Sequence, residues 1–156
     1  MPDGRYTFEI TEFAGAKTLS IRTKTTPDKI GETLAQILPE VHKYATESGA
    51  QITGMPFTIY HMWEDHECEI EGGIPVAAPV DGNDRVKNSE LPNSKVLTTL
   101  HQGPYEDLIH AYLEMGKYMQ ANGIKPTGPV WDSYITDPHE IPDPKDYQTR
   151  IYWPVA

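Results

Sequence analysis

The sequence predicts an α+β fold built from a tandem βαββ repeat. Several segments alternate apolar and polar residues as half-buried strands do, two segments carry apolar residues at helical spacing, and the order strand, helix, strand, strand occurs twice. The two halves span about residues 16–76 and 94–155, and the polar stretch 77–93 between them is predicted to be a loop. A chain of 156 residues has the usual size of one domain, so we expect residues 1–156 to form a single domain.

The first half opens with two predicted strands. Residues 6–13 and 17–25 alternate apolar and polar side chains, and Gly15 marks a break between them. Thr26 is a suitable N-cap, and Pro27 favours the first position of a helix. We therefore expect a helix to start at this point.

The predicted helix of the first half runs to Gly49. Its apolar stripe consists of Ile30, Leu34, Ile37, Leu38, Val41, Tyr44 and Ala45. Pro39 lies inside this helix and should kink it. Residues 55–63 and 67–76 are then predicted to be strands on either side of a turn at 64–66.

The second half restarts the pattern with a strand at 94–101. A helix should open at 103–104 and stop at 122–123, where an Asn-Gly pair forms a typical C-terminal signal. Its apolar stripe consists of Leu108, Ala111, Tyr112, Met115 and Met119. Strands at 129–137 and 146–155 follow, separated by a proline-rich loop.

The two halves share sequence as well as order. Residues 54–60 (GMPFTIY) parallel 128–134 (GPVWDSY), and 74–76 (IPV) parallel 153–155 (WPV). Two such units can bury a common face by joining their antiparallel sheets, which would place the helices on one side and leave a seam between the halves on the other. A groove at this seam is a natural site for a ligand.

Five motifs in a fixed order carry a family resemblance. They are GxPxxxY, GIPV, HQGPY, NGxxPxGPxWxxYxxDP and TxIYxPV. From about residue 6 to the C-terminus, the chain resembles the GyrI-like small-molecule-binding domain, the effector-binding domain of multidrug-responsive transcription regulators. The resemblance implies two βαββ modules related by a pseudo-twofold axis, with an aromatic-lined groove for flat, often cationic molecules. It also implies that some relatives belong to regulators and that one branch hydrolyses strained cyclopropane-bearing compounds.

The composition argues against several classes of partner. With 23 acidic and 13 basic residues the net charge is -10, which repels phosphate backbones, so we expect no direct nucleic-acid binding. No apolar stretch approaches membrane-spanning length and the first residues show no secretory signal, so we expect no membrane contact and a cytoplasmic location. The lone Cys68 cannot form an internal disulfide, which is typical of a reducing compartment.

Charged residues on two equivalent strands are the first candidates for the site. Glu69 and Glu71 share one strand face, and Glu71 precedes Pro75 by four residues as Arg150 precedes Pro154. Across the seam, Glu71 and Arg150 could pair or orient a polar ligand. The alternative is an ordinary solvated face of charges. The resemblance implies a ligand-facing glutamate at the position of Arg150, so the chain departs from the family there.

Aromatic residues near the predicted seam are the second set of candidates. They could form a stacking wall with polar hydroxyl tips, and they are Tyr60, Tyr105, Tyr112, Trp131, Tyr134 and Tyr152. Trp131 and Tyr134 cannot share a strand face because they are three residues apart. Each aromatic taken singly could instead serve core packing, whereas the set as a whole favours a pocket.

The sequence argues against a metal site and against a catalytic nucleophile. His61, Glu64 and His66 span a predicted turn without a regular ligand spacing, so we expect no metal. His101 has no serine or cysteine beside it in a nucleophile motif, which indicates a structural or rim role. No phosphate-binding loop occurs, and we expect no cofactor.

These features favour a stand-alone small-molecule-binding protein that senses or sequesters a drug-like aromatic or cationic ligand. A link to transcription regulation, with a regulator as protein partner, follows from the resemblance. The alternative is a hydrolase of the cyclopropane branch, in which Glu69 or Glu71 would activate water and Tyr134 would position or protonate the opening ring. A third possibility is a protein-interaction domain, because a groove can also hold a peptide.

Overall fold

The computed structural model describes residues 6–64, 66–137 and 140–156, in helices and antiparallel strands that confirm the α+β class. The chain divides into two compact units. We call Ala14–Asn93 the first unit, and Met1–Phe13 together with Ser94–Ala156 the second unit. No helix within the described residues combines the length and the apolar character needed to span a bilayer.

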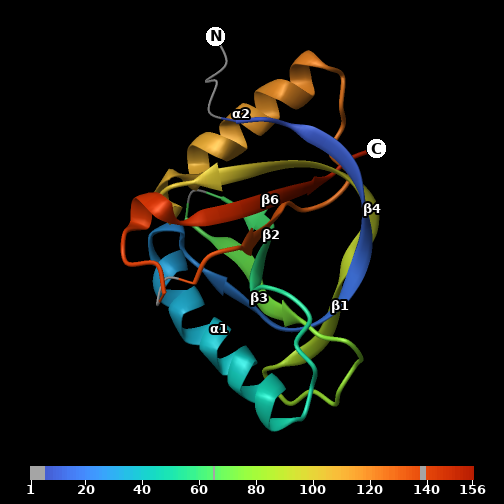
Figure 1. Ribbon diagram of the computed structural model, residues 1–156, viewed down its shortest axis with the longest axis vertical. Helices are drawn as coiled ribbons and strands as arrows, with labels where there is room; N and C mark the ends of the chain where they lie inside the picture. The colour runs from blue at the N-terminus through green and yellow to red at the C-terminus, as the bar shows by residue number, and fades with distance from the viewer. Residues whose placement is uncertain (1–5, 65, 138–139) are drawn as a thin grey trace. The chain divides into compact units, whose positions relative to one another are not determined.

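The first unit is an antiparallel sheet with the strand order β1–β3–β2 and a helix on one face. Its strands are β1 (Glu9–Thr25), whose first residues belong to the second unit, β2 (Phe57–Trp63) and β3 (Cys68–Pro75). Helix α1 (Ile30–Glu47) runs along this sheet, as Figure 1 shows. The core between them consists of Leu19, Ile21, Ile37, Val41, Ala45, Ile70, Ile74, Val76 and Val86.

The predicted break at Gly15 is wrong, because β1 is continuous from Glu9 to Thr25. Gly15 has a φ of +86°. A Cβ atom there would lie 3.2 Å from the Leu91 carbonyl oxygen and from the Asn93 amide nitrogen. Glycine therefore allows a local deviation and a close backbone approach without ending the strand.

The start of the first helix agrees with the prediction in place but not in detail. A 3-10 turn at Pro27–Lys29 precedes α1. Thr26 has extended backbone angles, and its hydroxyl bonds to Asp28 Oδ1 at 2.6 Å rather than to a backbone amide. Pro39 lies inside α1, which continues to its C-terminal end at Glu47. The predicted turn at 64–66 includes position 65, which lies outside the described residues.

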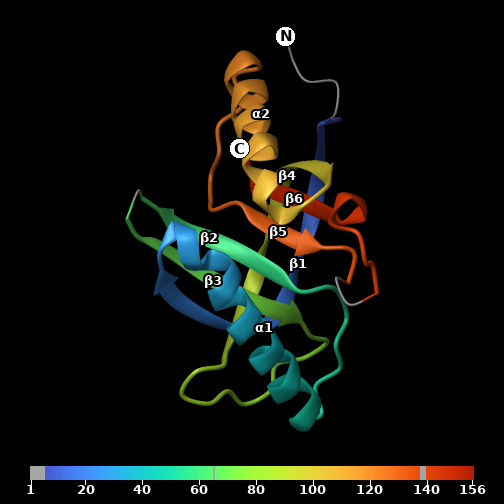
Figure 2. The same ribbon diagram turned by 90° about the vertical axis from the view of Figure 1, so that its left-hand side faces the viewer.

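The second unit repeats the arrangement with the strand order β4–β6–β5. Its strands are β4 (Lys87–Gln102), which begins in the first unit, β5 (Trp131–Tyr134) and β6 (Gln148–Pro154). Figure 2 shows helix α2 (Leu108–Ala121) beside β4 and β6. The core between helix and strands consists of Tyr6, Leu97, Leu108, Ala111, Met115, Met119, Ile151 and Val155.

The polar loop predicted for 77–93 is wrong in its last part, because residues 87–93 belong to β4. Leu91 is the only fully buried side chain in residues 87–93, so the segment carries no apolar alternation. Strand formation in this segment depends on backbone hydrogen bonding, and the pattern of apolar and polar side chains does not predict it. The predicted helix stop is confirmed: α2 ends at Ala121 and Gly123 has a φ of +66°.

The strands of the two units pair in corresponding registers. The pairs are Phe57 with Gly73 and Ile59 with Glu71 in the first unit, and Trp131 with Tyr152 and Ser133 with Arg150 in the second. Glu71 and Arg150 therefore occupy the same position in their respective sheets, as the sequence comparison predicts. The two side chains thus have equivalent positions in the two sheets, but their neighbours differ.

Candidate functional site

Glu71 lies on the sheet face opposite α1. The alternate residues Ile70 and Ile74 pack in the core under the helix, and a Cβ atom at Gly72 would meet Ile37 of α1 at 2.9 Å. Because side chains alternate along a strand, Glu71 points to the other face. Its exposed fraction is only 4%. The solvated-face alternative is therefore wrong for this residue.

Three polar side chains surround the Glu71 carboxylate. The Ser20 hydroxyl donates to Oε2 at 2.6 Å, and His61 Nε2 lies 2.7 Å from Oε1. Burial by itself would raise the pKa of the Glu71 carboxyl, but hydrogen bonds from His61, Ser20 and Ser89 outweigh it, together with the charge of His61, and lower this pKa to about 2. The structure thus holds a buried carboxylate in its ionised form.

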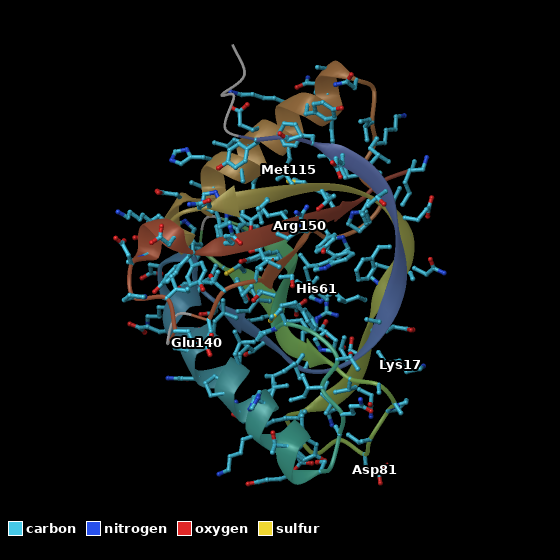
Figure 3. All side chains as sticks on the ribbon, viewed as in Figure 1. Lys17, His61, Asp81, Met115, Glu140 and Arg150 are labelled. Atoms are coloured by element: carbon cyan, nitrogen blue, oxygen red, sulfur yellow. The ribbon has the colours of Figure 1, made fainter. Side chains whose placement is uncertain are left out.

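His61 takes its place through a β-bulge. Tyr60 pairs with Ile70 and Met62 pairs with Glu69, so His61 is an extra residue in β2 without a partner position in β3. A bulge re-aims side chains locally and is frequent beside functional sites. The His61 side chain, labelled in Figure 3, is 18% exposed. It therefore connects the buried carboxylate to the accessible surface of the first unit.

Glu69 has different surroundings from Glu71. Arg22 donates to Glu69 Oε2 through Nε at 3.1 Å and through Nη2 at 2.6 Å. The Arg22 side chain is 54% exposed. Hydrogen bonding to Arg22 lowers the pKa of the Glu69 carboxyl. For Glu69 the structure fits a surface ion pair with Arg22, and the charge of His61 adds a smaller contribution to the lowered pKa.

An aromatic cluster occupies the equivalent face of the second unit. Trp131 is 1% exposed and stacks on Tyr152, with ring centroids 5.3 Å apart and an interplanar angle of 19°. Phe13 contacts both rings, at 5.1 Å from Trp131 and 5.3 Å from Tyr152. Arg150 alternates with Ile151 and so shares this face. Sequence reasoning missed Phe13, although its strand was predicted.

The other predicted tyrosines lie elsewhere in the units. Tyr105 packs against Tyr134 at 5.5 Å and against Tyr147 at 5.0 Å. Burial raises the pKa of Tyr105 to about 12, and Tyr147 and Asp137 add to the shift. In the first unit, Tyr60 packs against the core under α1.

A buried acid on the helix side of the second unit is a further unpredicted feature. Tyr112 of α2 donates to both carboxylate oxygens of Asp132, at 2.6 and 2.5 Å, and Asp132 is fully buried. Asp132 corresponds to Thr58 in the aligned motifs, and both positions are buried. A polar residue at the same place in both motifs was the signal that could have identified it.

His101 has a structural environment, in agreement with its predicted role. Its Nε2 lies 3.3 Å from the Pro104 carbonyl oxygen, which can only accept. Nδ1 therefore accepts from the Tyr6 hydroxyl at 2.8 Å. As for metals, residues 6–64, 66–137 and 140–156 contain no group of three or more side chains that could hold an ion.

An open depression in the first unit does not coincide with the predicted site. Its volume is about 430 Å³, and its lining consists of Lys17, Pro79, Asn88, Ser89 and Glu90. No aromatic side chain lines it. Of these residues, Ser89 touches the site through its hydrogen bond to Glu71. The depression itself gives no reason to assign a ligand.

The motif order and the fold agree with a known family model. The model of the GyrI-like small molecule binding domain matches residues 6–156. The chain belongs to this family. None of the curated proteins compared with the chain matches it.

Two solved structures of EcmrR are similar to the chain over nearly its whole length. The C-terminal domain of EcmrR has a TM-score of 0.87 and 22% identity, covering 97% of this chain and 98% of that domain. In the EcmrR–DNA complex, the match covers 97% of this chain but 57% of the longer EcmrR chain, with a TM-score of 0.88 and 22% identity. The chain thus spans little more than half of that protein.

Two more distant structures extend the comparison. A hydrolase from Listeria innocua has a TM-score of 0.62 and 18% identity, covering 96% of this chain and 91% of that chain. SAV2435 bound to tetraphenylphosphonium has a TM-score of 0.62 and 12% identity, covering 96% and 94%. At these identities the similarity concerns the fold.

Proposed function

We propose that the chain binds an aromatic organic cation and acts as a sensing or sequestering domain. The observation that carries this proposal is the buried Glu71 carboxylate, which hydrogen bonds keep ionised on the sheet face opposite the helix. A fixed negative charge with little water around it attracts a cation far more strongly than a hydrated carboxylate does. The net charge of -10 adds a long-range attraction of the same sign.

The aromatic rings of the second unit support an aromatic ligand. Tyr152 stacks on the buried Trp131, shares its sheet face with Arg150, and is the partly exposed ring of the pair. Aromatic faces bind cations and flat rings, and both properties suit the same class of ligand. That Glu71 and this cluster contribute to one groove at the seam of a pseudo-twofold repeat, as the sequence predicts, remains a prediction.

The proposed role is linked to transcription regulation without direct DNA contact by this chain. EcmrR occurs in a complex with DNA, but this chain corresponds to 57% of that protein. An acidic chain without a Lys and Arg cluster cannot neutralise several phosphates. A separate DNA-binding partner would supply that function. A salt-dependent mobility shift of duplex DNA by this chain alone would overturn this part of the proposal.

A thermal-shift titration with tetraphenylphosphonium tests the binding proposal. At a hundredfold excess over Kd a ligand stabilises the native state by about 2.7 kcal/mol, which is easily measured. We expect Glu71→Gln to weaken binding at least tenfold. The matched control is Glu47→Gln, an exposed substitution in α1, which should bind as the wild type does. Equal binding by Glu71→Gln would remove Glu71 from the site.

Arg150→Glu places a carboxylate at the position where the family resemblance implies one. If Arg150 and Glu71 face each other, this change should destabilise the unliganded protein by roughly 1 to 3 kcal/mol. It should also shift ligand preference towards cations. The double variant Glu71→Arg with Arg150→Glu should recover much of the stability. Unchanged stability and preference in the single variant would show that the two charges are not coupled.

Hydrolysis of cyclopropane-bearing compounds is the second candidate, favoured by the similarity to a protein described as a hydrolase. The acid–base properties of Glu71 argue for binding instead. A carboxyl with a pKa of about 2 is a weak base near neutral pH, so it would activate water poorly. Glu69 is engaged by Arg22 on the surface. Turnover of a cyclopropane substrate that is lost in Tyr134→Phe would support the hydrolase alternative.

A further inference from the structure

One nitrogen of His61 is not used by the Glu71 network. Nε2 lies 2.7 Å from Glu71 Oε1. Among the residues that the structure describes, the hydrogen bond of the His61 side chain is to Glu71, and Glu69 lies close enough for its charge to interact with His61. The side chain is 18% exposed, so the imidazole is accessible from solvent. Nδ1 is therefore available to a molecule from outside the protein.

The Glu71 carboxylate determines which nitrogen carries the proton. An ionised carboxylate can only accept hydrogen bonds, so Nε2 must donate. In the neutral imidazole, Nδ1 then has a lone pair and acts as an acceptor. Ser20 holds the other carboxylate oxygen at 2.6 Å, which fixes Glu71 and with it the imidazole. The arrangement thus provides an acceptor of defined identity beside a buried negative charge.

We propose that His61 Nδ1 accepts a hydrogen bond from an N–H group of the ligand, and that the ligand is a protonated aromatic amine. Glu71 acts as a positioning residue, because it fixes the tautomer of His61 and supplies the attracting charge. The inference rests on the proposed function and narrows its ligand class. A quaternary ammonium ion has the charge but no N–H group, so it would desolvate Nδ1 without replacing its hydrogen bond.

No equivalent acceptor exists at the corresponding places that the structure describes in the second unit. Both nitrogens of His101 are engaged, by Tyr6 and by the Pro104 carbonyl group. Arg150, at the position equivalent to Glu71, carries donors only. The selectivity for an N–H donor therefore depends on the bulged His61 of the first unit.

Calorimetric titration with a matched pair of probes tests the inference. The probes are dimethyl(naphthylmethyl)ammonium, which carries one N–H group, and trimethyl(naphthylmethyl)ammonium, which carries none. At mildly alkaline pH the first amine remains protonated and so carries the N–H group that the test requires. We expect the wild type to bind the dimethyl compound roughly tenfold more tightly or better.

Two variants separate the roles of His61 and Glu71. His61→Phe keeps a ring but removes the acceptor, so the preference should fall to about one. Glu71→Gln can donate to Nε2 and so allows the other tautomer, which should also reduce the preference while the imidazole remains. His42→Phe, an exposed substitution in α1, is the matched control and should keep the preference.

Nitrogen NMR of the histidine rings gives a readout that does not depend on affinity. In the wild type, His61 should show an unprotonated Nδ1, and its signal should move with the dimethyl probe more than with the trimethyl probe. A protonated Nδ1, or equal affinities for both probes, would overturn the inference while leaving cation binding intact. If neither cation binds, the proposed function itself fails.

Discussion

The two units place different chemistry on one strand arrangement. At equivalent register positions the first unit has Glu71 and the second has Arg150. Beside Glu71 stands Gly73, where a Cβ atom would lie 2.4 Å from the Leu19 carbonyl oxygen. The second unit has Tyr152 at this position, stacked on a tryptophan. The shared register therefore determines the positions of these side chains but not their chemical type. The first unit has a buried charged group at these positions, and the second unit has an aromatic cluster.

The side chain at the bulge position is the second difference between the units. The β2–β3 ladder shifts register at His61. Beyond the last β5–β6 pair, Tyr134 with Thr149, the amides of Ile135 and Thr136 both donate to the Gln148 carbonyl oxygen, so Ile135 stands where the first unit has His61. At this position the first unit has an imidazole, 2.7 Å from the Glu71 carboxylate, and the second unit has the apolar side chain of isoleucine.

The largest change in the free energy of unfolding is expected from the aromatic cluster of the second unit. Trp131→Ala removes a fully buried ring that contacts Phe13 and Tyr152, so it should destabilise the protein by about 3 to 5 kcal/mol. Urea unfolding measures this difference. Trp63→Ala is the control, because that ring is 55% exposed, and its cost should stay below about 1 kcal/mol. Similar costs for both would show that the cluster is not tightly packed.

The buried Glu71 carboxylate should contribute up to about 3 kcal/mol to the free energy of unfolding, and this contribution should depend on pH. The pKa of Glu71 falls from 4.5 to about 2 on folding, so its contribution is complete above pH 4.5 and is lost as the pH falls towards 2. The stability advantage of the wild type over Glu71→Gln should shrink over this range. Urea unfolding at a series of pH values measures it, with Glu47→Gln as the exposed control. A difference that stays constant with pH contradicts this account.

The buried acid of the second unit should give an intermediate effect. Tyr112→Phe leaves the fully buried Asp132 without the hydroxyl that donates to both of its oxygens, which should cost about 1 to 3 kcal/mol. Tyr118→Phe removes a hydroxyl from the same helix, where the ring packs on Phe8, and should change stability by less than about 0.5 kcal/mol. If both variants lose the same stability, the Asp132 bond contributes nothing specific.

The sequence predicted the structure correctly where buried apolar side chains recur at helical or strand spacing. The buried positions Met115 and Met119 of α2 follow the predicted stripe, and the stop at Gly123 has the required backbone angle. The errors concern backbone effects. Gly15 reads as a break but permits a deviation inside a continuous strand, and residues 87–93 form a strand almost without buried side chains. Backbone pairing between distant segments leaves little trace in local composition.

Prediction of the candidate site was limited by the same factor. Alternation placed Glu71 on the face away from the core but could not show that its carboxylate is buried. The contact of His61 with Glu71 depends on the register between β2 and β3, which a single sequence does not give. Asp132 is paired with Tyr112 of a helix twenty residues earlier in the chain, and such long-range partners are invisible in a single sequence.

The smallest effect is expected at Glu69, which tests whether the two acidic neighbours of β3 differ as their surroundings indicate. The Arg22 side chain is 54% exposed and the Glu69 side chain 24%. An exposed ion pair contributes about 0 to 1 kcal/mol because water and salt screen it and two long side chains lose freedom. Glu69→Gln should therefore change the free energy of unfolding by less than about 1 kcal/mol, and molar salt should abolish the difference. A larger, salt-independent loss in the free energy of unfolding would contradict the surface ion pair. A loss of cation affinity equal to that of Glu71→Gln would show that Glu69 belongs to the ligand site, as the sequence predicted.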